Sequence, residues 1–218
     1  MNTVLYVCSV NNIMAIKDRK ERDKLDRRKL ILESATRLFL KHGYEKASIR
    51  NIAEDIEYSP ATIYLYFKDK DEIFFILHEQ GFDILNHEFL KHEAVADPFE
   101  RLKAIGERYL QFSIDHPDYY DLMFMMKAPL NEISCMDKWD AGDNAFQFLM
   151  KTVGECIDQK LIKHTDPGLA AMTVWSFVHG LASLCIKDRF KSMQMGDDKS
   201  INAMLFQSFT YFMESMKA

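Results

Sequence analysis

The chain has 218 residues, of which 48% are hydrophobic and 12% aromatic, and a formal net charge of −5 at pH 7. This composition excludes a disordered chain and supplies enough apolar area for one large or two small domains. The net charge excludes a uniformly basic protein, but residues 17–70 hold 14 basic against 10 acidic side chains, whereas the residues after 70 hold 14 against 23. A basic amino-terminal part on an acidic body is compatible with DNA binding, because affinity depends on local phosphate neutralisation.

Residues 1–25 are expected to be an amino-terminal extension or arm. Residues 3–10 are apolar, but the run is too short for a signal peptide and lacks a basic flank and a cleavage pattern. Met14 stays open as an alternative start. Residues 17–29 carry eight basic and four acidic side chains, and two interpretations of them stay open: a solvated helical extension, or an arm that reaches DNA phosphate or the minor groove.

Residues 26–72 are expected to form a three-helix domain. Its first helix is predicted over about residues 26–42, because apolar residues follow helical spacing there and Gly43 is well placed to end it. Ser48 is the expected N-cap of a second helix over about 48–56, where apolar residues recur at three- and four-residue spacings.

A third helix is predicted to begin at Ser59 and Pro60, after a turn at residues 57–58. A Ser N-cap satisfies free backbone amides, and Pro is tolerated at the first helical position. The helix would be only about two turns long, so Ile63 and Phe67 should pack against its neighbour. Two short helices across a tight turn are typical of a helix-turn-helix.

The stretch SPATIYLYFKDKDEI at residues 59–73, preceded by Ile52 and Ala53, resembles the DNA-binding signature of the TetR family of bacterial repressors. The resemblance covers residues 28–74. It implies a three-helix DNA-binding head followed by a helical body for ligand binding and dimerisation. The sequence departs from the family at Glu57, where a glycine is usual, and a non-Gly residue in the left-handed region costs roughly 1–2 kcal/mol.

The resemblance also implies which side chains face DNA. Arg50 can pair bidentately with guanine, and Lys68 and Lys70 should bind phosphate, helped by free N–H groups at the start of the next helix. The alternative for each residue is an exposed polar side chain without a role. The DNA-facing residues implied on the third helix are Ser59, Pro60, Ala61, Thr62, Tyr64 and Tyr66.

The rest of the chain, residues 73–218, is predicted to be helical throughout, which makes the fold all-α. Asp69 is the expected N-cap of a fourth helix that reaches about residue 92 and links the two parts. Prolines and a glycine mark the later breaks. Five further helices are predicted at about 98–115, 117–127, 138–161, 167–189 and 200–216, which makes about nine helices in all.

Two body segments, HPDYY at 116–120 and WSFVHGL at 175–181, resemble a TetR subgroup whose effector domain carries a Trp/His-Gly element. Aromatic and methionine side chains crowd the predicted inner faces around them. Such a stripe is usually core, and the alternative is a pocket for an apolar or amphipathic effector, with room left by the bend at Pro117. The ligand-binding candidates are His116, Tyr120, Phe124, Trp175 and His179.

The last two long helices carry more apolar residues than one buried face needs. A helix that is apolar over much of its circumference is buried on two sides, which predicts a homodimer built mainly from these helices. The residues concerned are Met172, Trp175, Val178, Leu181, Leu184 and Cys185 in the first helix, and Ile201, Leu205, Phe209 and Phe212 in the second.

Catalytic and cofactor motifs are missing from the sequence, which has no nucleophile elbow, P-loop, metalloprotease helix or dinucleotide-binding glycines. We therefore expect no enzyme activity, no cofactor and no metal site. The four cysteines, Cys8, Cys135, Cys156 and Cys185, lack a C-x-x-C spacing and are expected to be reduced thiols in a cytoplasmic protein. No apolar run approaches about 18 residues, so no membrane span is expected.

These patterns predict a homodimeric, cytoplasmic transcriptional repressor that binds a near-palindromic double-stranded DNA operator and is released by a small-molecule effector. Release requires an effector that binds one arrangement of the body better than the other. Two rivals stay open: an architectural or partner-recruiting DNA-binding protein of the same fold without a ligand, and an enzyme or interaction module that binds no operator. The presence or absence of an apolar cavity in the body would distinguish the repressor from the first rival. Operator binding would distinguish it from the second.

Overall fold

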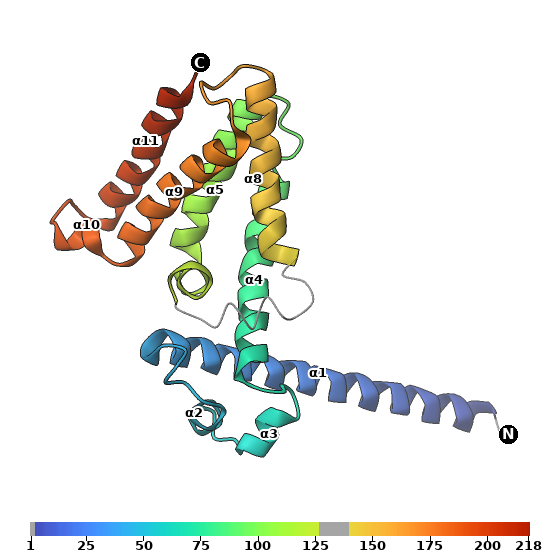
Figure 1. Ribbon diagram of the computed structural model, residues 1–218. Coiled ribbons are helices and arrows are strands. Elements are labelled where there is room, and N and C mark those ends of the chain that lie inside the picture. Colours follow the sequence, from blue (N-terminus) through green and yellow to red (C-terminus); the bar gives the residue numbers. More distant parts are fainter. Residues whose placement is uncertain (1–2, 127–139) are drawn as a thin grey trace. The chain divides into compact units, whose positions relative to one another are not determined.

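A computed structural model describes the backbone of residues 3–126 and 140–218, and the side chains of residues 19–126 and 141–218. The described residues form ten α-helices and one π-helical segment, with no β-strand among them (Figure 1). The chain divides into two compact units, Met1–Phe74, here called the head, and Phe75–Ala218, called the body. The predicted all-α class, with a helix-turn-helix head and a helical body, is confirmed.

The head contains α1 (Thr3–His42), α2 (Ile49–Asp55) and α3 (Pro60–Tyr64). The sequence predicted a first helix over residues 26–42, whereas α1 begins at Thr3 and includes most of the predicted extension. No Gly or Pro interrupts this stretch, so nothing in the basic run ends the helix. Gly43 follows α1 with φ +79°, the left-handed conformation that ends many helices.

Short-range caps explain where α2 and α3 begin. The Ser48 hydroxyl accepts the Asn51 amide hydrogen at 3.2 Å, and the Ser59 hydroxyl accepts that of Thr62 at 3.2 Å. Both serines have the extended backbone of N-cap residues, and a cap of this kind contributes about 1 kcal/mol. Between the two helices Glu57 takes φ +57°, so this turn holds a non-glycine residue in the left-handed region.

The helix α1 supports the helix-turn-helix by packing against α2. Ile63 and Phe67 are buried, as predicted, and anchor α3 in the core of the head. Asp55, at the end of α2, accepts hydrogen bonds from the Ser34 hydroxyl and the Arg37 guanidinium of α1, both at 2.7 Å. The bond from Ser34 and then that from Arg37 lower the pKa of the Asp55 carboxyl.

The helix α4 (Lys70–Leu90) begins in the head and continues into the body. The Asp69 carboxylate caps it by accepting the Glu72 amide hydrogen at 2.8 Å, as predicted. The remaining elements are α5 (Pro98–Asp115), α6 (Pro117–Tyr120), the π-helical η1 (Asp121–Met125), α8 (Asp140–Asp158), α9 (Pro167–Ile186), α10 (Arg189–Ser192) and α11 (Asp198–Met216).

One predicted body helix is divided in the structure and another is followed by a short additional helix, which is why the described residues hold more elements than the nine predicted. The segment predicted as 117–127 is the four-residue α6 followed by η1, and its last residue lies outside the described part. The segment predicted as 167–189 ends as α9 at Ile186, because Asp188 adopts φ +50° and the chain restarts as α10. The helix predicted as 98–115 matches α5 at both ends.

The helix α5 lies at the centre of the body, where it packs against α8, α9 and α11 (Figure 1). A Cβ added at Gly106 of α5 would lie 2.1 Å from Cζ of Phe209. The absent side chain therefore lets the Phe209 ring of α11 rest directly on the α5 backbone.

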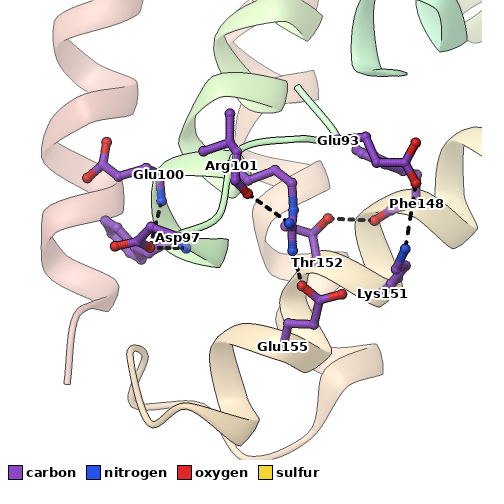
Figure 2. A network of polar contacts seen from close by, with 10 residues as sticks. Glu93, Asp97, Glu100, Arg101, Phe148, Lys151, Thr152 and Glu155 are labelled. Atoms are coloured by element: carbon purple, nitrogen blue, oxygen red, sulfur yellow. Dashed lines mark hydrogen bonds and ion pairs between the residues drawn. The ribbon is translucent and has the colours of Figure 1, made fainter. Parts of the chain in front are cut away.

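A polar clamp joins the start of α5 to α8 (Figure 2). Arg101, only 9% exposed, donates to the Val95 carbonyl oxygen at 2.9 Å and to the Glu155 carboxylate. Asp97 caps α5 by accepting two amide hydrogens at 2.8 and 3.2 Å. The cost of removing the Arg101 charge from water offsets much of what its ion pair contributes. The clamp therefore positions the loop before α5 more than it adds net stability.

The helix α9 is strongly apolar. By length and composition alone it could cross a bilayer, with a mean hydropathy of 1.7, which corrects the expectation that no segment is apolar enough. A single such helix is weak evidence for a membrane, because core helices of soluble proteins share this composition. Val174 and Val178 are buried in the body, whereas Leu169 is 68% and Met172 48% exposed, so α9 has an apolar face that its own chain leaves uncovered.

Candidate DNA-binding surface and ligand site

The outer face of α3 is the first candidate site. Tyr64 is 57% exposed and Leu65, directly after the helix, is 78% exposed, while Ile63 is fully buried. Leu65 was not among the residues predicted to lie on this face. An apolar residue next to an outward-facing tyrosine, at the end of so short a helix, is a pattern that indicates its exposure. The predicted residues that are also exposed here are Ser59, Pro60 and Ala61.

Thr62 and Tyr66, which were also predicted to face DNA, are half-buried and already engaged within the head. The Thr62 hydroxyl lies 2.9 Å from that of Ser59. The Tyr66 carbonyl oxygen accepts a hydrogen bond from Arg28 at 3.0 Å, and the Tyr66 hydroxyl accepts one from Arg27, which raises the pKa of Arg27. Tyr66 therefore joins α3 to α1, and Tyr64 is the tyrosine available to another molecule.

Arg50 is placed at the outside of α2, with 81% of its side chain exposed. Its Nε lies 3.0 Å from Oε1 of Glu54, one helical turn further on. An exposed ion pair of this kind is worth about 0–1 kcal/mol, so the guanidinium can exchange it for a stronger bidentate partner.

The two lysines after α3 have different surroundings. The ammonium group of Lys70 donates to the Tyr44 carbonyl oxygen at 2.9 Å and lies 3.9 Å from the centre of the Tyr44 ring. Lys68 is 79% exposed, and its ammonium lies 3.7 Å from the Asp69 carboxylate. Lys68 is therefore the more available cation, while Lys70 also ties α4 to the loop before α2.

Four polar aromatic side chains from three body helices meet in the second candidate site. The Trp175 indole N–H donates to the Tyr109 hydroxyl at 3.3 Å, and the Tyr109 hydroxyl donates to that of Tyr120 at 3.2 Å. The Tyr120 hydroxyl lies 2.7 Å from Nδ1 of His179, and the Tyr109 hydroxyl lies 3.3 Å from the same atom. Tyr120, Trp175 and His179 were predicted, whereas Tyr109 was not singled out from the other aromatic side chains of the predicted inner faces.

Phenyl rings surround this group. Phe124 of η1, also predicted, lies with its ring centre 4.9 Å from that of Tyr120 and 5.8 Å from that of His179, and Phe146 of α8 lies 6.0 Å from Trp175. Burial raises the pKa of both tyrosines and lowers the pKa of His179, so all three groups are neutral at neutral pH. The result is an uncharged cluster with a polar centre and aromatic walls.

His116 lies outside this cluster, and its contact with a ligand stays a prediction. Its ring packs on Phe112 at 5.3 Å and on Tyr119 at 6.4 Å between centres. His116 ends α5 with φ −132° and ψ 55°, and this break separates its side-chain direction from that of Tyr120 four residues later.

Metal-binding chemistry finds no support among the described side chains, where no group of three or more His, Cys, Asp or Glu residues could hold an ion. Cys156 and Cys185 are free thiols, and burial raises the pKa of Cys156 to about 12. Cys135 and the side chain of Cys8 lie outside the described part of the chain.

Two family models match the sequence. Residues 31–77 match the model described as bacterial regulatory proteins of the tetR family, and residues 102–207 match the tetracyclin repressor-like C-terminal domain. The first match contains the helix-turn-helix, and the second contains the aromatic cluster.

Curated relatives align over part of the chain. The transcriptional regulator HbdR of Aromatoleum sp. (strain CIB) is 37% identical over 78 residues, which cover 35% of this chain and 34% of HbdR. The regulator SAB2452 of Staphylococcus aureus is 30% identical over 97 residues, which cover 44% of this chain and 52% of that protein. The chain thus spans a third to a half of the length of these relatives.

Solved structures share the fold over most of the chain. The fatty acid degradation regulator FadR from Bacillus halodurans gives a TM-score of 0.67 at 15% identity, covering 85% of this chain and 94% of FadR. AibR in complex with isovaleryl coenzyme A and operator DNA gives a TM-score of 0.60 at 21% identity, covering 72% of this chain and 86% of AibR. At these identities the likeness is one of fold.

Proposed function

Given that the chain belongs to the TetR family of bacterial transcriptional regulators, we propose that it is a cytoplasmic repressor that binds operator DNA and leaves it when a small molecule binds the body. The observation that carries this proposal is the outer face of α3. A five-residue helix, capped by Ser59 and anchored by Ile63, presents Tyr64 to the solvent on a basic head. That geometry suits a recognition helix in a major groove.

The head would divide its contacts between bases and phosphates. Arg50 offers a planar donor pair for a guanine edge, and Tyr64 and Leu65 offer apolar area for a thymine methyl group. Lys68 would bind phosphate. Lys70 would also bind phosphate, and its hydrogen bond to the Tyr44 carbonyl oxygen stabilises the head.

A second copy of the chain would cover the exposed apolar face of α9 and α11 and so form the homodimer. The Phe177 and Phe212 rings stack across these helices with centres 4.1 Å apart and planes 8° apart. A two-fold dimer places two heads on a near-palindromic operator. The face includes a groove of about 500 Å³ lined by Leu169, Met172, Thr173, Ser176, Phe177 and Phe212.

The effector would bind at the aromatic cluster around Tyr120 and His179. A small apolar or amphipathic molecule that fits only one arrangement of these side chains would favour that arrangement of the body. Because α4 is one continuous helix from Lys70 to Leu90, the change could reach the head and alter operator affinity. AibR, solved with isovaleryl coenzyme A and operator DNA, supports this kind of response, and the WSFVHGL segment supports the Trp/His-Gly subgroup.

A footprint of the purified protein on the DNA upstream of its own gene tests the proposal, repeated with a library of small metabolites. We expect a protected near-palindrome that at least one compound abolishes, and protection by Tyr64→Ala only at higher protein concentration. A footprint that no compound changes would favour the ligand-independent architectural protein. Absence of any protected site would overturn the DNA-binding function, and sedimentation as a monomer at micromolar concentration would overturn the dimer.

A further inference from the structure

The hydrogen bonds in the aromatic cluster run in one direction. An indole N–H can only donate, so the Tyr109 oxygen accepts a hydrogen bond from Trp175. The Tyr109 hydroxyl in turn donates its hydrogen to the Tyr120 oxygen. The Tyr120 hydroxyl then has two acceptors within reach, Nδ1 of His179 at 2.7 Å and the His179 carbonyl oxygen at 3.5 Å. The shorter contact has the length of a good hydrogen bond and the longer one does not, so Nδ1 accepts.

This direction assigns the tautomer of His179. A neutral imidazole whose Nδ1 accepts a hydrogen bond carries its hydrogen on Nε2. Burial lowers the pKa of His179, which keeps the ring neutral. Among the described residues nothing accepts a hydrogen bond from Nε2, and the ring is only half-buried.

The surroundings of this donor are aromatic. The Phe124 ring centre lies 5.8 Å from that of His179, and the Trp175 ring centre lies 6.3 Å from it. A charged group brought against these rings would lose hydration without gaining a countercharge, whereas a neutral acceptor on an apolar molecule would lose little.

We propose that Nε2–H of His179 is the polar recognition group of the ligand site, and that it selects apolar molecules carrying a neutral carbonyl oxygen. Tyr109 and Tyr120 act as positioning residues, because they hold the hydrogen on Nε2 and orient the ring. Trp175 and Phe124 contact the apolar part of the ligand. The assignment rests on the proposed ligand-responsive function and adds the class of compound that the site takes.

Nitrogen-15 NMR of the full-length protein labelled at histidine tests the tautomer without any ligand. We expect His179 to show the Nε2–H pattern at neutral pH, and the double variant Tyr109→Phe/Tyr120→Phe to populate both tautomers because Nδ1 then loses both hydroxyl groups within its reach. A His179 ring with its hydrogen on Nδ1, or one that is protonated at neutral pH, would overturn the proposal. That result would not count against the proposed operator binding, which the footprint tests.

A pair of ligands of equal shape tests the selection. Decan-2-one carries a carbonyl oxygen, and 2-methyldec-1-ene replaces that oxygen by a methylene group. The emission of Trp175 reports binding in a Trp139→Phe background, which leaves one tryptophan. We expect the ketone to bind about five- to tenfold more tightly than the alkene, the effect of one hydrogen bond.

His179→Phe and the double variant Tyr109→Phe/Tyr120→Phe complete the experiment, with circular dichroism to confirm that each variant is folded. His179→Phe should bring the two affinities to within about twofold of each other, since the donor is lost. The tyrosine variant should lower the preference for the ketone in proportion to the fraction of the Nε2–H tautomer that remains. Equal affinities in the parent, or a preference that survives in both folded variants, would overturn the role of His179. Failure of both compounds to change the Trp175 emission would also overturn it, and the operator footprint would then judge the repressor function separately.

Discussion

In the head, the side chains proposed to contact DNA point out of the fold, whereas in the body the proposed effector site is built on tyrosines that are part of the packing. Arg50 is 81% and Tyr64 57% exposed, but Tyr120 is 0% and Tyr109 5% exposed. A DNA groove is itself concave and needs a protruding helix, while a small molecule must be enclosed to lose its hydration. Substitutions in the head should therefore separate function from stability, and substitutions in the body should change both.

The largest expected effect is that of Tyr120→Ala. The fully buried ring contacts Tyr109, Phe124 and His179, so its removal should lower the free energy of unfolding by about 3–5 kcal/mol. Urea unfolding followed by circular dichroism measures this. Tyr64→Ala is the matched control, expected within about 0.5 kcal/mol of the parent. Equal losses in the two variants would show that the contrast between head and body is wrong.

Acid should destabilise the body before the head. His78 of α4 is 1% exposed and donates to the Met123 carbonyl oxygen, and burial lowers its pKa to about 4. Since the folded state resists protonation, stability is complete above pH 6.5 and falls as the pH drops towards 4, by up to about 3 kcal/mol. The lowered pKa of Asp55 in the head acts in the same direction, but only as the pH falls below the ordinary Asp range.

Urea unfolding between pH 7.5 and pH 4 checks this order, with His78→Phe as the comparison. The variant should show a flatter decline over the range in which His78 titrates. An identical decline in parent and variant would assign the acid sensitivity to other groups.

Operator affinity should respond to the exposed side chains of the head. Arg50→Ala and Tyr64→Ala should each weaken binding to the operator by about 1–3 kcal/mol, the value of one good base contact, while the urea midpoint stays unchanged. Fluorescence anisotropy on labelled operator DNA measures the loss. Parent-like affinity in either variant would show that this side chain lies outside the reading surface.

The two lysines provide a finer comparison within the head. Lys68→Ala should weaken binding to every DNA sequence and flatten the dependence of log K on log salt by about one unit. Lys70→Ala should have a similar effect and should also lower stability by about 1 kcal/mol, because it loses the hydrogen bond to the Tyr44 carbonyl oxygen. A Lys70→Ala protein as stable as the Lys68→Ala protein would contradict the structural part assigned to Lys70.

The smallest expected effect concerns two residues whose backbone adopts the left-handed conformation. Glu57 in the head has φ +57° and Lys160 in the body has φ +55°, and glycine would relieve about 1 kcal/mol of strain at each position. Thermal unfolding should show a similar small gain for Glu57→Gly and Lys160→Gly. Operator affinity should change only with Glu57→Gly, because that turn sets the angle between α2 and α3. A change of operator affinity in Lys160→Gly would contradict this.

Signals that act over three or four residues could be read from the sequence with good accuracy. Ser48, Ser59 and Asp69 cap the helices that were predicted to start at them, and the residues expected to bury α3, Ile63 and Phe67, are buried. These features depend on a side chain and an amide close together in the chain, so their physics is contained in a short window. The same holds for α5, whose Asp97 and Pro98 mark its start.

Long-range contacts were not predictable in this way. Trp175, Tyr109, Tyr120 and His179 meet although up to 70 residues separate partners in the chain, and no spacing pattern says that three helices will bring these hydroxyl, indole and imidazole groups together. The exclusion of His116 depends on one backbone break, and the attachment of Lys70 to Tyr44 on how a loop packs against α4. Hydrogen-bond direction, burial and hence pKa are properties of the assembled core, because each depends on neighbours that only packing supplies.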